Sequence, residues 1–399
     1  MRMRPKILFR VFFYFLPIIT QCSCSKQQSI RYEIIDIIPP GETGTWGEAC
    51  SINENGDVAG YLSTSTTHNK LSLFFWSAQK KTILYGPEID SRDDSDKIRI
   101  NEQQDIMCLK YSSAFHKKLP FIWNPSTGRT TFLATTIVTE PNIILFFGLN
   151  NYGAALLGLG DWNYYKTIIW NISEDKPILY PKGFLGSALN DKGILAGQAY
   201  DDNPNFRKAA IWLRDEDICR IDYTPEQYTC VEDINEKNEV VGWIVKGKRE
   251  RKRAYVWSSD RGLRELGCIQ DMNTFFNGYH AKALSINNKG QVVGWSTAGT
   301  VPGPLIWPVV FYDDGRAFYW DEKVGMVDLN KIVVPDKNWR QLVKAHDIND
   351  KGQIVGWGLK KGSSGEYPFL LIPLKETRTN YEQMPIKMQN SLKNDSVQK

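Results

Sequence analysis

The chain has 399 residues and a small net charge of +4, from 49 Lys and Arg against 45 Asp and Glu. Four of the basic residues and none of the acidic ones precede residue 22, so the remainder carries 45 charges of each sign. A nucleic-acid-binding protein needs a basic excess, which argues against a nucleic-acid partner. The four His and seven Cys show no spacing typical of a zinc site, and we predict neither a metal nor a cofactor.

Residues 1–24 have the pattern of a signal peptide. Arg2, Arg4 and Lys6 precede an apolar run from Val11 to Thr20, which is too short to span a bilayer. We therefore expect export to the periplasm, the cell surface or the extracellular space, with no transmembrane segment in the mature chain. Cys22 and Cys24 lie where the lipid-bearing cysteine of a lipoprotein would be, so lipid anchoring is an open alternative.

One ten-residue pattern occurs seven times along the chain. Its clearest copy is Ile348–Trp357, which has the sequence INDKGQIVGW. The others begin at Ile52, Ile100, Leu149, Leu189, Ile234 and Ile286, and the starts are 40 to 62 residues apart. Repeats of this period are typical of propellers, solenoids and arrays.

The pattern predicts a tight turn between two strands. Asn349 opens the turn with its side chain, and Gly352 supplies the positive φ that closes a three-residue hairpin loop. Asn238 replaces that glycine in the fifth copy and tolerates the same conformation. Gln104 replaces it in the second copy, where we expect a looser or strained turn.

A second signal follows six of the seven turns: an apolar pair ending in Trp, then often a Gly and a short apolar strand; in the seventh repeat Phe369-Leu370-Leu371 stands in its place. Val256-Trp257 followed by Gly262 is an example. The alternation of apolar and polar residues indicates strands with one buried face. Each repeat is thus predicted to be four antiparallel strands, A to D. We expect the repeat Trp residues to be core, together with the Trp after the Val-Gly of the pattern, at positions 243, 295 and 357.

The two ends of the repeat region complement each other. Residues 31–38 alternate like a D strand before the first turn, whereas the seventh repeat stops after its third strand near residue 374. An N-terminal strand that completes the last sheet closes a ring and removes the free sheet edges. We predict an all-β, seven-bladed β-propeller over residues 31–374, monomeric, followed by a flexible polar tail at 375–399.

The repeat resembles the HAF repeat of predicted extracellular bacterial proteins. Arg316–Trp320 with Asp328-Leu329, and Ala254–Trp257 with Glu265–Gly267, carry the resemblance. The His of that pattern is missing in every copy. The resemblance implies export and a propeller-like fold, and it supplies no catalytic residues.

We find no catalytic constellation in the sequence. Ser258–Gly262 has the Ser-x-Asp-x-Gly skeleton of an Asp-box but is more simply a C–D turn. The acidic run Asp90–Asp96 lacks calcium-loop spacing, and His280 and His346 are interpreted as structural. Cys219 and Cys230 are near enough in sequence to form a disulfide in an exported protein.

The B–C loops do not follow the repeat, and variable loops on a rigid scaffold often carry binding. The candidate partner-binding residues are Lys246, Lys248, Arg249, Arg251, Lys252 and Arg253 in the fifth repeat, and Trp162, Tyr164 and Tyr165 in the third. The basic loop is alternatively a solvated hairpin tip.

Three functions stay open. The first is a non-enzymatic exported propeller that binds a protein, a glycan or an anionic envelope surface through the face formed by its B–C and D–A loops. The second is a hydrolase or lyase acting on a polysaccharide, for which acids and bases would cluster in the central channel. The third is a purely structural envelope component.

Overall fold

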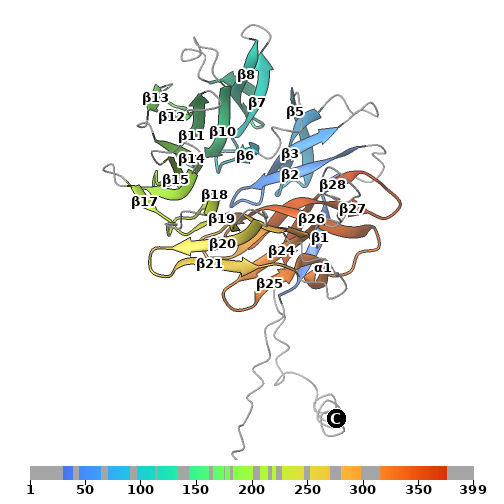
Figure 1. Cartoon of the computed structure of the whole chain (residues 1–399). Helices are drawn as coiled ribbons and strands as arrows, with labels where there is room; N and C mark the ends of the chain where they lie inside the picture. The colour runs from blue at the N-terminus through green and yellow to red at the C-terminus, as the bar shows by residue number, and fades with distance from the viewer. Residues whose placement is uncertain are drawn as a thin grey trace, which may run out of the picture.

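The computed structural model describes residues 30–38, 45–63, 71–89, 97–112, 116–133, 143–160, 165–174, 176–179, 183–200, 207–213, 218–221, 227–246, 252–269, 280–297 and 315–374. These residues form seven four-stranded antiparallel sheets arranged as the blades of a β-propeller (Figure 1). The predicted signal peptide and polar tail lie outside the described residues.

Blades 1 to 6 are each built from strands that are consecutive in the chain, with the first strand innermost. Blade 1 contains β2 (Trp46–Ile52), β3 (Val58–Ser63), β4 (Leu71–Ser77) and β5 (Thr82–Ile89). Blade 2 contains β6 (Arg99–Ile100), β7 (Ile106–Ser112), β8 (Lys117–Asn124) and β9 (Arg129–Phe132). Blade 3 contains β10 (Ile143–Leu149), β11 (Ala154–Gly160), β12 (Tyr165–Asn171) and β13 (Lys176–Leu179).

The remaining blades continue the same order. Blade 4 contains β14 (Phe184–Leu189), β15 (Leu195–Tyr200), β16 (Arg207–Trp212) and β17 (Ile218–Arg220). Blade 5 contains β18 (Gln227–Ile234), β19 (Val240–Lys246), β20 (Lys252–Ser258) and β21 (Gly262–Gly267). Blade 6 contains β22 (His280–Ile286), β23 (Val292–Thr297), β24 (Gly315–Asp321) and β25 (Gly325–Asp328), followed by the short helix α1 (Leu329–Ile332).

Blade 7 closes the ring as predicted. It contains β26 (Trp339–Ile348), β27 (Ile354–Lys360) and β28 (Glu366–Pro373), and its outer strand is the N-terminal β1 (Tyr32–Asp36). The register pairs Ile34 with Leu371 in an antiparallel ladder. The first strand of the chain therefore pairs with the last, and neither leaves an unpaired edge at the junction.

The seven repeat turns are the A–B hairpins of the seven blades. Gly352 has φ +76°, and Asn238 and Gln104 have φ +61° and +64°. The predicted left-handed conformation is thus present even where glycine is replaced. Gln104 compensates in part, because its Nε2 donates a hydrogen bond to Asp57 Oδ2 of blade 1 at 2.8 Å.

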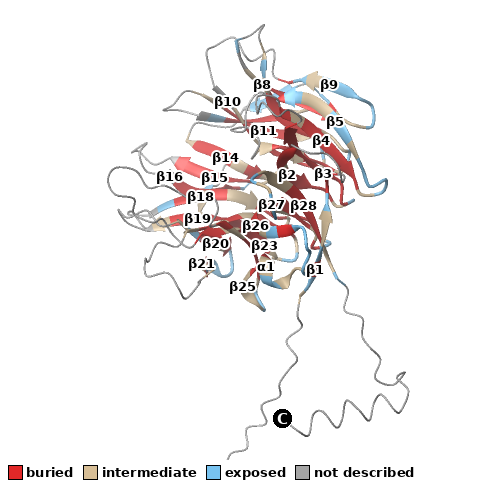
Figure 2. Ribbon diagram, turned by 90° about the vertical axis from the view of Figure 1, so that its right-hand side faces the viewer, coloured by how far each residue is buried: buried red, intermediate tan, exposed pale blue. Residues whose placement is uncertain are grey.

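The core consists of apolar clusters between neighbouring blades, which appear as the buried inner parts of the sheets in Figure 2. The repeat Trp residues belong to these clusters as predicted, with Trp170 the most deeply buried at 1% exposure. Trp357 is also buried, at 6%. Trp243 and Trp295 are only half-buried, so the expectation that they belong to the core was wrong.

The disulfide between Cys219 and Cys230 that the sequence leaves open is not formed, and both thiols are free. Cys219 lies in β17, the outermost strand of blade 4, whereas Cys230 lies in β18, the innermost strand of blade 5. Cys219 is therefore at the outer rim of the ring, and Cys230 is on the strand that lines the channel.

Candidate functional site: the central channel and its two ends

The propeller has two faces with different backbone structure. We call the end that carries the A–B and C–D hairpin turns the turn face, and the end that carries the B–C and D–A connections the loop face. The innermost strands run between the two faces and line a central channel. Cavities of about 370 and 160 Å³ occupy this channel, at the turn-face mouth and in the interior.

The residue after each repeat Asn forms a closed belt around the turn-face mouth. A side-chain oxygen of this residue accepts a hydrogen bond from the backbone N–H of the equivalent residue in the preceding blade, at 2.7 to 2.9 Å in all seven joints. The members are Glu54, Glu102, Asn151, Asp191, Glu236, Asn288 and Asp350. These acidic and amide side chains therefore hold the blades together. Burial and the neighbouring carboxylates of Asp350 and Glu102 raise the pKa of Glu54.

The repeat Asn residues form a second belt, which is open at one joint. The Nδ2 of Asn349 donates to the backbone oxygen of Asn53 in the next blade at 3.0 Å. Five further joints carry the same bond, at 2.9 to 3.3 Å. At the joint between blades 2 and 3, the buried Nδ2 of Asn101 has no partner. The buried Nε1 of Trp170, which belongs to the apolar cluster between blades 2 and 3, has no partner either.

A third set of bonds joins neighbouring blades in the channel interior. Ser285 Oγ lies 3.0 Å from Asp233 Oδ2 and 2.8 Å from Asp347 Oδ1. Asp347 Oδ2 accepts a hydrogen bond from Ser51 Oγ at 2.9 Å. Because one hydroxyl proton cannot satisfy both neighbouring carboxylates, the arrangement favours a proton on one of them. Consistently, burial raises the pKa of Asp233 to about 6.

The same two aspartates also accept backbone N–H groups. Asp233 bonds the N–H of Ile234 and Ile286, and Asp347 bonds those of Ile348 and Ile52, all at 2.8 to 2.9 Å. Three of the four carboxylate oxygens of the pair thus bond a neighbouring blade, and the fourth, Asp233 Oδ1, accepts the N–H of Ile234 in its own blade. We interpret Asp233 and Asp347 as structural clamps rather than as a catalytic carboxylate pair.

One pair of titratable groups in the channel has a different character. His346 Nε2 lies 2.7 Å from Glu48 Oε2, and Glu48 Oε1 accepts a hydrogen bond from the Tyr61 hydroxyl at 2.7 Å. His346 also lines the interior cavity, together with Arg99. A carboxylate that orients an imidazole is the arrangement expected of a general base. The interpretation of His346 as structural, made from the sequence, did not anticipate this contact with Glu48.

The predicted basic loop joins β19 to β20 as expected for a B–C connection. Lys246 ends β19, Lys252 and Arg253 begin β20, and Lys248, Arg249 and Arg251 lie outside the described residues. Arg253 forms an ion pair with Glu265 at 3.0 Å. In the third repeat Tyr165 begins β12, while Trp162 and Tyr164 also lie outside the described residues.

Lys252 belongs to an aromatic and cationic cluster at the loop face, which the sequence analysis missed. We call it the Trp243 cluster; its members are Tyr228, Trp243, Lys252, Lys282 and Trp295. The ammonium groups of Lys252 and Lys282 lie 4.7 and 5.0 Å from the centre of the Trp243 ring. Lys282 also lies 5.9 Å from the Trp295 ring.

Two further contacts orient the cluster. Trp243 Nε1 donates a hydrogen bond to Glu232 Oε1 at 2.8 Å, and Glu232 lines the interior cavity. The Tyr228 ring lies 5.5 Å from that of Trp243. The indole thus has a fixed orientation at the seam between blades 5 and 6, beside the channel.

Exposure distinguishes this seam from equivalent positions in other blades. The registers place Trp243 opposite Cys230, Trp357 opposite Lys344 and Tyr61 opposite Glu48. Tyr61 and Trp357 are buried, at 0% and 6% exposure, whereas Trp243 is half-buried. The repeat therefore supplies an aromatic position, and only some blades present it at the surface.

Among the described residues, no helix has the length and apolar character needed to cross a membrane. The same part of the chain contains no group of three or more His, Cys, Asp or Glu side chains positioned to hold a metal ion.

Comparisons with known proteins support the fold. Residues 173–304 match the model of a protein family of unknown function (DUF3466). No curated protein matches the sequence. Similar solved structures include an oligogalacturonate lyase from Vibrio parahaemolyticus, with a TM-score of 0.56 and 10% identity, covering 87% of this chain and 98% of that one.

Two peptidase structures also contain a similar β-propeller. The β-propeller domain of the Trilobed protease from Pyrococcus furiosus gives a TM-score of 0.52 at 9% identity, covering 82% of this chain and 93% of that one. An acylaminoacyl peptidase from Pyrococcus horikoshii gives 0.51 at 12% identity, covering 83% of this chain and 52% of that one. At such low identity these likenesses show a shared β-propeller fold and no shared activity.

Proposed function

We propose that this protein is an exported, non-enzymatic binding propeller that holds an acidic glycan at its loop face. The observation that carries the proposal is the Trp243 cluster, in which two lysine ammonium groups lie within 5.0 Å of the centre of one half-buried indole. An indole packs against the apolar C–H face of a sugar ring. A neighbouring ammonium pairs with the carboxylate or sulfate of an acidic sugar.

The location of the cluster also favours binding. Its member Lys252 begins β20 at the loop face, so the cluster is adjacent in sequence to the predicted basic loop. A second group at the loop face also combines a lysine with aromatic rings: Lys360 lies 5.2 Å from the Trp339 ring and 4.9 Å from the Tyr367 ring, and its ammonium is paired with Asp36 at 3.1 Å. Repeated aromatic and cationic groups on one face suit a polymer with repeated negative charges.

The glycan is favoured over a lipid surface because the described aromatic groups are recessed rather than protruding. Tyr228, the most exposed member of the Trp243 cluster, has 38% of its surface exposed, and Trp243 is half-buried. A membrane-binding site would need apolar side chains that extend beyond the surrounding surface.

The test is a binding assay by calorimetry with polygalacturonate, neutral dextran and vesicles of anionic phospholipid, at low and high salt. We expect binding to polygalacturonate that weakens at high salt, because exposed charges are screened within about 10 Å at 0.1 M ionic strength. Trp243→Ala and Lys282→Ser should each weaken it about tenfold, as expected for an anchor in a binding site.

The control is Tyr152→Ala, which removes an aromatic side chain that is 77% exposed on the turn face. This variant should bind like the wild type. Equal binding by the Trp243→Ala variant, or a preference for vesicles or dextran, would refute the assignment of an acidic glycan to this cluster.

A polysaccharide lyase or hydrolase is a second candidate, favoured by the contact between His346 and Glu48 in the channel. In this alternative His346 is the general base, held by Glu48. Incubation with polygalacturonate would release unsaturated or reducing chain ends, and His346→Gln would abolish their release. Absence of product from the wild-type protein on acidic and neutral polysaccharides would contradict this alternative and leave the binding function intact.

A further inference from the structure

The first residue of each repeat pattern presents its backbone N–H to the channel. These residues are Ile52, Ile100, Leu149, Leu189, Ile234, Ile286 and Ile348. The residue after each of them bonds across its own hairpin, as the N–H of Asn150 does to the backbone oxygen of Ala154. Because N–H groups alternate in direction along a strand, the preceding N–H points away from the hairpin, to the inner edge of the blade. Such a group inside a protein requires an acceptor.

In five of the seven blades a side chain of the channel supplies this acceptor. Asp347 spans two blades, since Oδ1 accepts from Ile348 in its own blade and Oδ2 from Ile52 in the next one, both at 2.9 Å. Asp233 spans blades 5 and 6 in the same way. A serine hydroxyl of blade 1 accepts the N–H in blade 2. One aspartate directly before the repeat pattern therefore serves the amides of two neighbouring blades.

Blades 3 and 4 differ, because their residues at the aspartate position are Gly148 and Ala188, which carry no acceptor. Within the described part of the chain, no side chain accepts from the N–H of Leu149 or Leu189. These are the two amides that an aspartate at position 148 would serve, one in its own blade and one in the next. All four residues line the interior cavity of about 160 Å³.

The surroundings of Gly148 have room for a carboxylate. A Cβ added to this glycine would lie 3.8 Å from the backbone nitrogen of Leu189 and 3.8 Å from Leu156 Cβ, which are ordinary contact distances. Gly148 does not have a positive φ. Neither the backbone nor the packing thus requires a glycine here, and the space beside the two amides is part of the cavity.

Arg99 adds a positive charge on the same side of the channel. It occupies the aspartate position in blade 2, directly before Gly148 in the ring, and among the described residues that line the cavity it is the only Arg or Lys. Three carboxylates also line the cavity, and each has donors of its own. Glu232 accepts from Trp243 Nε1, and Asp233 and Asp347 accept from N–H groups and serine hydroxyls.

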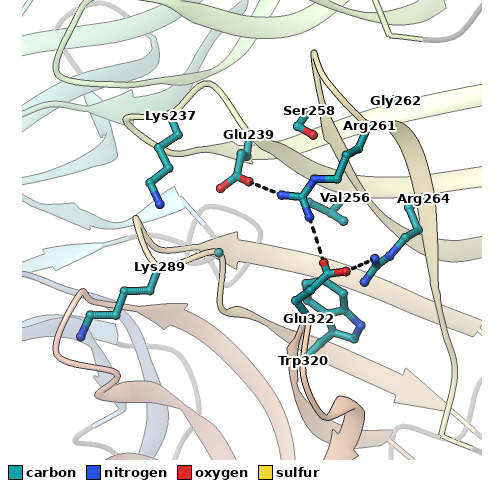
Figure 3. A pocket seen from close by; sticks show the side chains of 11 residues that line it. Lys237, Glu239, Val256, Ser258, Arg261, Gly262, Arg264, Lys289, Trp320 and Glu322 are labelled. Atoms are coloured by element: carbon teal, nitrogen blue, oxygen red, sulfur yellow. Dashed lines mark hydrogen bonds and ion pairs between the residues drawn. The ribbon is translucent and has the colours of Figure 1, made fainter.

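A cavity between blades 5 and 6 at the turn face shows the contrast (Figure 3). It has a volume of about 220 Å³, and its arginines are paired with carboxylates. Arg261 lies 3.5 Å from Glu239 and 3.2 Å from Glu322, and Arg264 is also paired with Glu322. These ion pairs join the two blades and explain the charged residues of that cavity without a ligand.

We propose that the interior cavity binds a small carboxylate, which takes the place that aspartate has in blades 5 and 7. One carboxylate oxygen accepts the N–H of Leu149 and the other that of Leu189, as the two oxygens of Asp347 do in blades 7 and 1. Arg99 contributes a charge-assisted bond. The cavity of about 160 Å³ has the volume of about five water molecules. This volume suits a small free acid such as acetate or the carboxyl end of a sugar acid.

The test is calorimetric titration of the full chain at pH 7 with sodium acetate, sodium galacturonate and sodium chloride. Gly148→Asp places a carboxylate of the protein itself between the two amides. Its matched control is Tyr152→Asp, which adds the same charge to the turn of the same blade at a side chain that is 77% exposed. Arg99→Gln removes the cation, and it tests the proposal independently of how Gly148→Asp folds.

We expect acetate to bind the wild type, and Gly148→Asp and Arg99→Gln to bind it at least about tenfold more weakly, because both lose charge-assisted bonds. Tyr152→Asp should bind it like the wild type. Acetate should raise the melting temperature of the wild type, since it binds the folded state alone. Without acetate, Gly148→Asp should melt above the wild type. Tighter binding of galacturonate than of acetate identifies a sugar acid as the ligand, and the reverse identifies a small free acid.

Three results would overturn the proposal: no binding of either carboxylate by the wild type, chloride binding as tight as that of acetate, or unchanged acetate binding in both Gly148→Asp and Arg99→Gln. Lys282→Ser should leave acetate binding unchanged, and Gly148→Asp should leave polygalacturonate binding at the loop face unchanged. Failure of this proposal is therefore distinguishable from failure of the acidic-glycan function.

Discussion

The open joint between blades 2 and 3 allows the inter-blade bond to be measured with a matched pair of substitutions, Asn150→Ala and Asn101→Ala. Both side chains are buried, and both accept two backbone N–H groups of their own turn through Oδ1, at 2.8 to 3.1 Å. They differ in Nδ2. That of Asn150 donates to the backbone oxygen of Asn190 at 3.3 Å, whereas that of Asn101 has no partner.

The difference between the two variants follows from these contacts. The loss of the Oδ1 bonds is common to both and cancels. Asn150→Ala also loses the inter-blade bond, worth about 1 kcal/mol net, while Asn101→Ala removes a buried unsatisfied donor that costs about 1–3 kcal/mol. Asn150→Ala should therefore lower the free energy of unfolding by roughly 2–4 kcal/mol more than Asn101→Ala does.

The assay is urea unfolding followed by circular dichroism, with the free energy taken from variants whose m-values equal that of the wild type. Asn53→Ala provides a second intact joint, since Asn53 Nδ2 donates to the backbone oxygen of Asn101 at 3.2 Å. It should behave like Asn150→Ala. Equal destabilisation by Asn101→Ala and Asn150→Ala would show that the Nδ2 contact does not stabilise the ring.

Three further outcomes are expected. Deletion of residues 31–38 should sharply lower the melting temperature, because it removes β1 and leaves β28 with an unpaired edge; a variant that melts like the parent would contradict closure by this strand. Gly352→Val should lower the free energy of unfolding by roughly 1–2 kcal/mol, because a β-branched residue is strained at the φ of +76° that Gly352 has. Asn238→Gly should be neutral or mildly stabilising. Urea unfolding measures both effects. The free energy of unfolding should fall by about 2 kcal/mol as pH rises from 4 to 7. The reason is that the pKa of Asp233 is about 6 in the folded protein, against 3.8 for an ordinary carboxyl. The stabilisation from protonated Asp233 is therefore complete below the ordinary pKa and is lost as pH rises through the folded pKa. Asp233→Asn should flatten this slope, and an unchanged slope would exclude Asp233 as its source.

The sequence by itself determined the number of blades, the place of each A–B turn and the closing strand. These features follow from local chemistry: Asn349 and Gly352 specify a hairpin turn through their own backbone preferences, and an identical pattern elsewhere specifies the same turn. The missing fourth strand of blade 7 and the alternating residues 31–38 made ring closure predictable, because unpaired edges are unfavourable in a sheet.

Only the tertiary structure decided which side chains meet across a joint. The contact between Glu48 and His346 joins residues 298 positions apart, and no local pattern encodes it. The Trp243 ring likewise contacts Lys282 of the neighbouring blade, and this contact is not visible in the local sequence pattern. The same repeat position is buried in blade 1, where Tyr61 bonds Glu48.

The acidic or amide residue that follows each repeat Asn shows the same contrast between local and tertiary information. Its place in the turn is visible in the sequence, but its bond to the preceding blade requires the ring to be closed. The repeat therefore specifies each blade, and the packing of unlike neighbours around the ring decides where the surface is available for a ligand.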